Sequence, residues 1–65
     1  MISFKPLFGW LAENGITIND FKKDTGISDF MIKNMKRYGK FRIRCIDTIC
    51  TVYQLRIEDI MRYEP

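Results

Sequence analysis

The chain has 65 residues, a formal net charge of +3 and a hydrophobic content of 46%. This length predicts a single domain over residues 1–65, and the composition is that of a folded protein rather than a disordered one. A chain without histidine is poorly equipped for a zinc site, no segment approaches the roughly 20 apolar residues that cross a bilayer, and nothing resembles a signal peptide. We therefore expect a cytoplasmic protein with no metal, no cofactor and no membrane partner.

The first predicted helix carries an apolar stripe at spacing i, i+3, i+4 and i+7, formed by Phe4, Leu7, Phe8 and Leu11. Pro6 suits the first turn of this helix, where its missing backbone N–H is not needed. Gly15 suits a C-terminal cap in the left-handed conformation. Trp10 lies at the edge of the stripe. Partial burial of its ring beside the core is favoured over contact with a partner.

The second and third predicted helices are joined by a three-residue step, Gly26-Ile27-Ser28. Thr17 and Asp20 have the spacing of a capping box at the start of the second helix. Ser28 is placed to cap the third helix, and Asp29 complements the dipole of its first turn. A short helix, a tight turn containing glycine and another helix together predict a helix-turn-helix.

The third helix is predicted over about residues 28–38, with Gly39 as its stop. Ile32 and Met35 are expected to face the core, and Met31 and Tyr38 to lie near the same side.

The fourth helix is predicted from about Ile43 to Tyr53, with an apolar stripe of Ile46, Ile49, Cys50 and Tyr53. The alternation in "KFRIRCI" is typical of a strand, but no partner strand is visible elsewhere, so we interpret it as a loop that leads into the helix. "RIEDIM" predicts a final helical turn in which Ile57, Ile60 and Met61 close the core. The fold class is therefore all-α with five helices.

The two cysteines, Cys45 and Cys50, are five residues apart on the fourth helix. At roughly 100° per residue their side chains point about 140° apart, which suits neither a disulfide nor a shared metal. We expect them to be small buried thiols.

The basic stretch, residues 33–44, reads "KNMKRYGKFRIR" and contains six Lys or Arg residues. No acidic residue occurs between Phe30 and Ile46, so its positive potential is local and directional. The stretch is either a solvated surface or a surface for phosphates.

The segment "GITINDFKKDTGISDFMIKNMKRYGKFRIRCIDTICTVYQLRIEDIM" resembles the Cro/lambda-repressor-like helix-turn-helix family, also called the XRE family. The most specific part is the pattern T-x-x-[DE]-[FL]-x-x-x-TGIS, and the likeness covers about residues 4–62. It implies a compact five-helix lambda-repressor-like domain with a helix-turn-helix formed by helices 2 and 3. It also implies a sequence-specific transcriptional regulator, expected to be a repressor, whose third helix lies in the major groove of double-stranded DNA.

The resemblance also implies which residues contact DNA. Base contacts are expected from Ser28, Asp29, Phe30, Lys33, Asn34 and Arg37. Phosphate contacts are expected from Thr17, Lys40 and Arg42, together with Lys36 and Arg44 of the basic stretch. Five positions depart from the family pattern. Lys22 stands where a small residue is usual, Ile18 where Gln is frequent, Arg42 where Ser or Thr begins the fourth helix, and Asp29-Phe30 where Gln, Ser or Thr is common.

The side chains of the third helix have suitable chemistry in their own right. Arg37 can bind guanine in a bidentate manner, and Asn34 can do the same with adenine. Phe30 either packs on a thymine methyl group, belongs to the core or contacts a protein. Asp29 either accepts from cytosine or serves only as a helix-start residue.

Three functions remain to be distinguished. A DNA-binding regulator would be expected to act as a homodimer, since one small domain gathers few contacts, and the closing helix with the tail "RYEP" is the expected surface. The alternative is a protein-interaction module on the same fold, such as an antirepressor or an antitoxin-like partner. An enzyme with a small-molecule substrate is not expected, because histidine, a glycine-rich phosphate loop and paired carboxylates beside a nucleophile are all missing.

Overall fold

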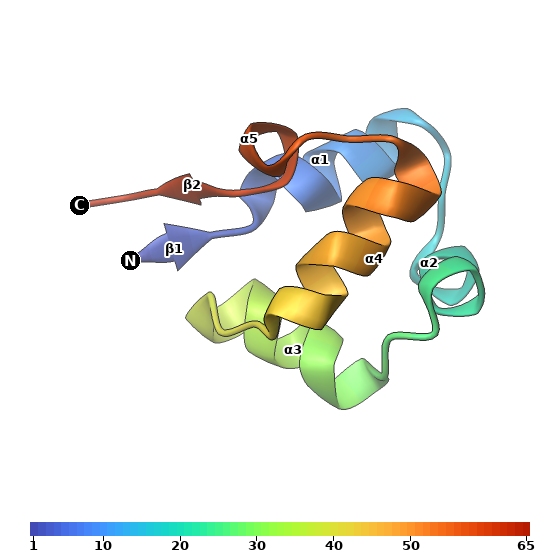
Figure 1. Cartoon of the computed structure of the whole chain (residues 1–65), viewed down its shortest axis with the longest axis horizontal. Helices are drawn as coiled ribbons and strands as arrows, with labels where there is room; N and C mark the ends of the chain where they lie inside the picture. Colours follow the sequence, from blue (N-terminus) through green and yellow to red (C-terminus); the bar gives the residue numbers. More distant parts are fainter.

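Five helices and a pair of very short strands make up the fold, which a computed structural model describes over residues 1–65. In chain order the elements are β1 (Ile2–Ser3), α1 (Lys5–Glu13), α2 (Ile18–Thr25), α3 (Asp29–Tyr38), α4 (Ile43–Tyr53), α5 (Ile57–Ile60) and β2 (Arg62–Tyr63). Figure 1 shows α4 crossing in front of the other helices, with both chain ends on one side. None of the helices combines the length and the apolar character needed to span a membrane.

Local hydrogen bonds explain where α2 and α3 begin. The Thr17 hydroxyl accepts from the Asp20 N–H at 3.1 Å, and the Asp20 carboxylate accepts from the Thr17 N–H at 3.2 Å, which is the predicted capping box. These bonds from Thr17 lower the pKa of Asp20. The Ser28 hydroxyl accepts from the Met31 N–H at 3.3 Å, so the predicted cap of α3 is also confirmed. Both helices end at a glycine in the left-handed conformation, which is Gly26 for α2 and Gly39 for α3.

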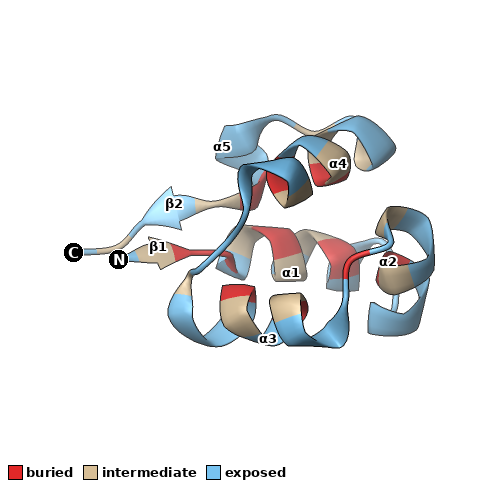
Figure 2. Ribbon diagram, turned by 60° about the horizontal axis from the view of Figure 1, so that its bottom comes forward, coloured by how far each residue is buried: buried red, intermediate tan, exposed pale blue.

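The core lies around α1. In Figure 2, α1 runs between α3 on one side and α4 with α5 on the other, and the buried surfaces face inward. Ten hydrophobic residues are buried: Phe4, Leu7, Leu11, Phe21, Ile27, Ile32, Met35, Ile46, Ile49 and Ile60. The predicted apolar stripes of the first, third and fourth helices therefore face the core, as expected from their spacing.

Three sequence-based expectations about burial are wrong. Tyr38 is 56% exposed, because it is the last residue of α3 and its ring lies beside Lys40 rather than over the core. Ile57 is 53% exposed, because it is the first residue of α5 and only Ile60, one turn later, reaches the interior. Cys45 and Cys50 are free thiols that are half-buried at the edge of the core, not fully buried.

The position of α2 is fixed by Tyr53 at the end of α4. The Tyr53 ring stacks on Phe21 with centroids 6.1 Å apart, and its hydroxyl donates to Asp24 Oδ2 at 3.0 Å. Burial, reinforced by this bond to a carboxylate, raises the pKa of Tyr53 to about 12. The phenol is therefore protonated at neutral pH and ties α2 to α4.

The two ends of the chain form a clasp that the sequence analysis did not predict. β1 and β2 pair in antiparallel fashion, with Ile2 opposite Tyr63 and Ser3 opposite Arg62. The Glu64 N–H donates to the Met1 carbonyl at 2.8 Å, and the amino group of Met1 donates to the Glu64 carbonyl. We call this pair of strands the terminal clasp. It occupies the tail that had been expected to mediate dimerisation.

The terminal clasp also holds the end of α3. Gly39 has a φ of +64°, and a Cβ atom placed there would overlap the carbonyl group of Ile2. By contrast, a Cβ atom at Gly15 or Gly26 would meet nothing within 4 Å. Only glycine therefore lets β1 pack directly on the chain as it leaves α3.

Candidate nucleic-acid interface

The exposed side of α3 forms one arc of side chains. Ile32 and Met35 are buried against the core, and at roughly 100° per residue the opposite side of the helix is occupied by other residues. Figure 2 shows this exposed side of α3 turned away from α1. We call it the outward arc, and it consists of the exposed residues Phe30, Lys33 and Arg37 together with the half-buried Asn34.

The leading end of α3, residues 28–30, is open to solvent. Phe30 is 72% exposed, which excludes the core as its place in the fold. Lys22, whose long side chain departs from the family pattern, extends to Asp29 and places its Nζ 2.9 Å from Oδ2. The leading end therefore presents an exposed aromatic ring beside a carboxylate whose charge is already paired.

Lys36 lies on a different side of α3 from the outward arc. Its Nζ lies 5.6 Å from the centroid of the Phe8 ring, so it points along the flank that faces α1. A cation over an aromatic ring is a favourable contact in its own right. The structure thus separates Lys36 from the other predicted DNA contacts on α3.

A hollow of about 380 Å³ lies between the turn that joins α2 to α3 and the first turns of α4. Its lining includes Ser28 and Phe30 from the leading end of α3, and Arg42 and Arg44 from the start of α4. Both arginines are exposed. Two predicted phosphate contacts and two predicted base contacts therefore line the same hollow.

Thr17 is placed farther away. It precedes α2, whose eight residues span about 12 Å before the turn into α3. Its hydroxyl is already used in the capping box, and the residue is exposed. Any contact of Thr17 with a phosphate would therefore lie a helix length from the leading end.

The pairing of charges differs between the basic stretch and the rest of the chain. The basic stretch has six cationic side chains: Lys33, Lys36, Arg37, Lys40, Arg42 and Arg44. None of them lies within 4.0 Å of a carboxylate. Of the five Lys and Arg residues elsewhere, four are paired with acids, namely Lys5, Lys22, Arg56 and Arg62. The positive charge of the basic stretch is therefore uncompensated locally, as a phosphate-binding surface requires.

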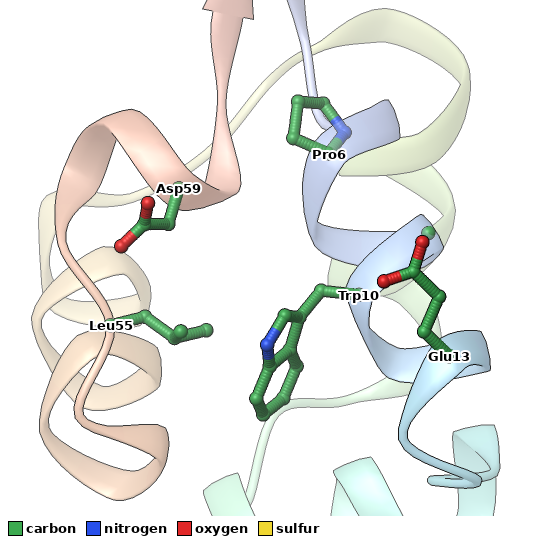
Figure 3. Close-up of a pocket in the computed structure, with 6 residues that line it drawn as sticks. Pro6, Trp10, Glu13, Leu55 and Asp59 are labelled. Carbon is green, nitrogen blue, oxygen red and sulfur yellow. The ribbon is translucent and has the colours of Figure 1, made fainter.

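A second hollow has the opposite electrostatic character. It has a volume of about 500 Å³, and Figure 3 shows Trp10 of α1 and Leu55 facing each other across it, with Glu13 and Asp59 at its borders. Trp10 is half-buried and packs against Tyr53 with ring centroids 5.4 Å apart, so the predicted partial burial of Trp10 is confirmed. Asp59 is paired with Arg56, whereas Glu13 has no cation within 4.0 Å, so the charge of Glu13 disfavours phosphate here. This hollow could not be predicted from the sequence, because its two acids are 46 positions apart and come together only through the packing of α1 on α5.

A family model described as a Cro/C1-type HTH DNA-binding domain matches residues 9–65 of the chain. Comparison with curated proteins and comparison with solved structures each found no match.

Proposed function

Because the chain belongs to the family of Cro/C1-type helix-turn-helix DNA-binding domains, we propose that it is a transcriptional repressor that recognises a specific sequence of double-stranded DNA. The observation that carries this proposal is the unpaired basic stretch beside an exposed leading end of α3. In the proposed complex α3 lies in the major groove, and the protein acts in the cytoplasm without catalytic activity. The wide major groove admits a helix and offers a distinct pattern of donors and acceptors for each base pair.

We assign the base contacts to the leading end and the outward arc, which comprise Ser28, Asp29, Phe30, Lys33, Asn34 and Arg37. Arg37 suits guanine, Asn34 suits adenine, and the exposed ring of Phe30 suits a thymine methyl group. We assign phosphate contacts to Thr17, Lys40, Arg42 and Arg44. Lys36 belongs to this set only if its side chain leaves the Phe8 ring.

The salt dependence of binding to duplex DNA tests the proposal. Each phosphate contact that is lost reduces the slope of log affinity against log salt by about 1. The double variant Arg42→Ala, Arg44→Ala is therefore expected to lower the slope by about 2. The matched control is Arg56→Ala, Arg62→Ala, which removes the same charge from residues that pair with acids, and should keep the wild-type slope. Binding that does not change between low and high salt would contradict a phosphate surface.

We further propose that the protein binds DNA as a homodimer through α4 and α5. A hollow of about 270 Å³ between these helices is lined by Ile43, Ile46, Cys50 and Ile57, with Asp47 at its edge. Ile43 and Ile57 are 72% and 53% exposed, which leaves apolar surface open at this place. This patch is small compared with the roughly 800 Å² per partner of a stable interface, so pairing should be weak in solution and strengthened on DNA.

Sedimentation with and without DNA tests the dimer. Ile57→Asp is expected to abolish the two-to-one complex on a duplex with two half-sites while leaving one-to-one binding to a single half-site. Val52→Asp is the matched control, because Val52 is 41% exposed on the opposite flank of α4. An equal loss for both variants would point to general damage to the fold instead of a shared surface.

The alternative function is a protein-interaction module on the same fold, such as an antirepressor or an antitoxin-like partner. The exposure of Phe30 supports it, because aromatic residues are enriched at protein interfaces. Comparing Phe30→Ala with Lys33→Ala separates the two functions. A protein interface loses activity at Phe30 and tolerates the change at Lys33, whereas a DNA surface is weakened by both.

A further inference from the structure

Lys22 and Asp29 join the two helices of the helix-turn-helix. The Lys22 Nζ lies 2.9 Å from Asp29 Oδ2, and this is the single ion pair between α2 and α3. Both residues depart from the family pattern, and the structure shows that the two departures are in contact. A carboxylate at the leading end of α3 thus occurs together with a lysine placed to reach it.

The ion pair is not needed for the start of α3. Ser28 already caps the helix, and a carboxylate in the first turn is favoured by the helix dipole without any lysine. The side chains of Lys22 and Asp29 are 34% and 69% exposed, and ion pairs this open to water contribute little to folding. The pair gains importance only when a partner removes that water.

DNA is a partner that would do so. A bare carboxylate at the leading end would face phosphates, and like charges in a dehydrated interface repel strongly. Lys22 neutralises Asp29 through Oδ2, and the other oxygen, Oδ1, accepts no hydrogen bond in the structure. Asp29 therefore has one oxygen fixed and one oxygen available.

Among the base edges of the major groove, a free carboxylate oxygen fits cytosine best. Cytosine presents its N4 amino group as a donor, whereas guanine and thymine present acceptors that would repel the carboxylate. Adenine presents an amino donor beside the N7 acceptor, so its edge is only half favourable.

We propose that Lys22 is a positioning residue for base recognition: it holds Asp29 by Oδ2 so that Oδ1 accepts from the amino group of a cytosine. The proposal rests on the proposed function, since it requires α3 in the major groove. It adds that this protein prefers cytosine at the position facing Asp29, and that the preference depends on a residue of α2.

A double-mutant cycle tests the inference. Wild type, Lys22→Met, Asp29→Ala and the double variant are measured against duplexes chosen from a random pool, and against the same duplexes with each position replaced in turn by the other three base pairs. Wild type is expected to prefer cytosine at one position by about tenfold, within the range of a good base contact. Asp29→Ala removes the acceptor and should abolish this preference, and Lys22→Met should weaken it at least threefold. In the Asp29→Ala background, Lys22→Met should have almost no further effect.

Lys23→Met is the matched control, because Lys23 is the neighbouring exposed lysine and has no carboxylate partner. It should leave the base preference unchanged. Circular dichroism should show the wild-type helix content for every variant, since all the substituted side chains are largely outside the core.

Three results would overturn the inference. If Lys22→Met lowers affinity by the same factor with and without Asp29→Ala, then Lys22 contacts a phosphate itself. If Asp29→Ala leaves the base preference intact, then Asp29 does not read a base. If wild type binds no duplex at all, the proposed function fails together with the inference. The first two results, by contrast, contradict the inference and leave DNA binding intact.

Discussion

The two ends of α3 are held in different ways. At its C-terminal end, the trailing end, Gly39 packs directly under the carbonyl group of Ile2, and the terminal clasp covers the chain. At the leading end, Ser28 supplies one cap and Asp29 one exposed ion pair, and Phe30 extends into solvent. A helix that contacts a partner with one end gains precision when its other end is fixed to the fold. The leading end can then keep its side chains free.

The leading end also depends on α2, which is attached to α4 through Tyr53. This attachment combines a ring stacked on Phe21 with a hydrogen bond to Asp24. The trailing end is thus fixed by backbone contact, whereas the leading end is fixed by side chains. Substitutions should reveal this difference as a gradient of effects.

Among substitutions at the two ends of α3, the largest effect is expected from Gly39→Ala. Alanine in the left-handed conformation costs about 1–2 kcal/mol, and overlap of its methyl group with the backbone of Ile2 adds a further 1–3 kcal/mol. The sum approaches the whole stability expected of so small a domain. Urea unfolding measures it, with Gly26→Ala as the control, which has the same backbone conformation but open space. Equal losses for the two variants would show that the terminal clasp does not hold the trailing end.

Ser28→Ala is expected to cost about 1 kcal/mol, the usual value of an N-cap. Thr51→Ala is the control, because Thr51 is exposed within α4 and caps nothing, so its change should stay within about 0.5 kcal/mol. Thermal unfolding measures both. A loss for Ser28→Ala as large as that for Gly39→Ala would remove the contrast between the two ends.

The attachment through Tyr53 predicts a pH dependence. Because burial and the bond to Asp24 raise the pKa of Tyr53 from 10.0 to about 12, the folded state holds this proton more tightly than the unfolded state does. The free energy of unfolding should therefore fall as the pH rises from about 10 to about 12. Tyr53→Phe should remove this part of the fall in urea titrations, whereas Tyr63→Phe, whose ring is 72% exposed, should retain it. Identical slopes for both variants would contradict a role for the Tyr53 hydroxyl.

The smallest effect on stability is expected from Phe30→Ala. Because the ring is 72% exposed, the change in unfolding free energy should stay within about 0.5 kcal/mol, while affinity for DNA falls. Phe21→Ala is the contrasting variant, since that ring is fully buried and its loss should cost about 3–5 kcal/mol. A large loss of stability for Phe30→Ala would mean that the leading end is part of the folded framework.

Features set by neighbouring residues could be predicted from the sequence. The bounds of α4, Ile43–Tyr53, match the prediction, and so do the capping box of Thr17 and the cap of Ser28. These features depend on spacing and on hydrogen bonds across three residues, which the sequence displays directly. The terminal clasp was missed because each of its strands has two residues and its contacts span nearly the whole chain.

The candidate site shows the same division. The outward arc follows from the positions of Ile32 and Met35, so its membership could be predicted. The ion pair between Lys22 and Asp29 could not, because the angle between α2 and α3 decides whether the two side chains meet. The placement of Lys36 over Phe8 likewise depends on how α3 packs against α1.

The separation of unpaired cations from paired ones also gives the molecule an electric dipole. Six unpaired cations lie in residues 33–44, while Glu13, which has no cation within 4.0 Å, borders the hollow between α1 and α5. A protein with such a dipole is turned by the field of DNA before contact, so more of its collisions are productive. The rate of association should therefore fall steeply as salt is added, and arrival in the correct orientation would begin at a distance from the duplex.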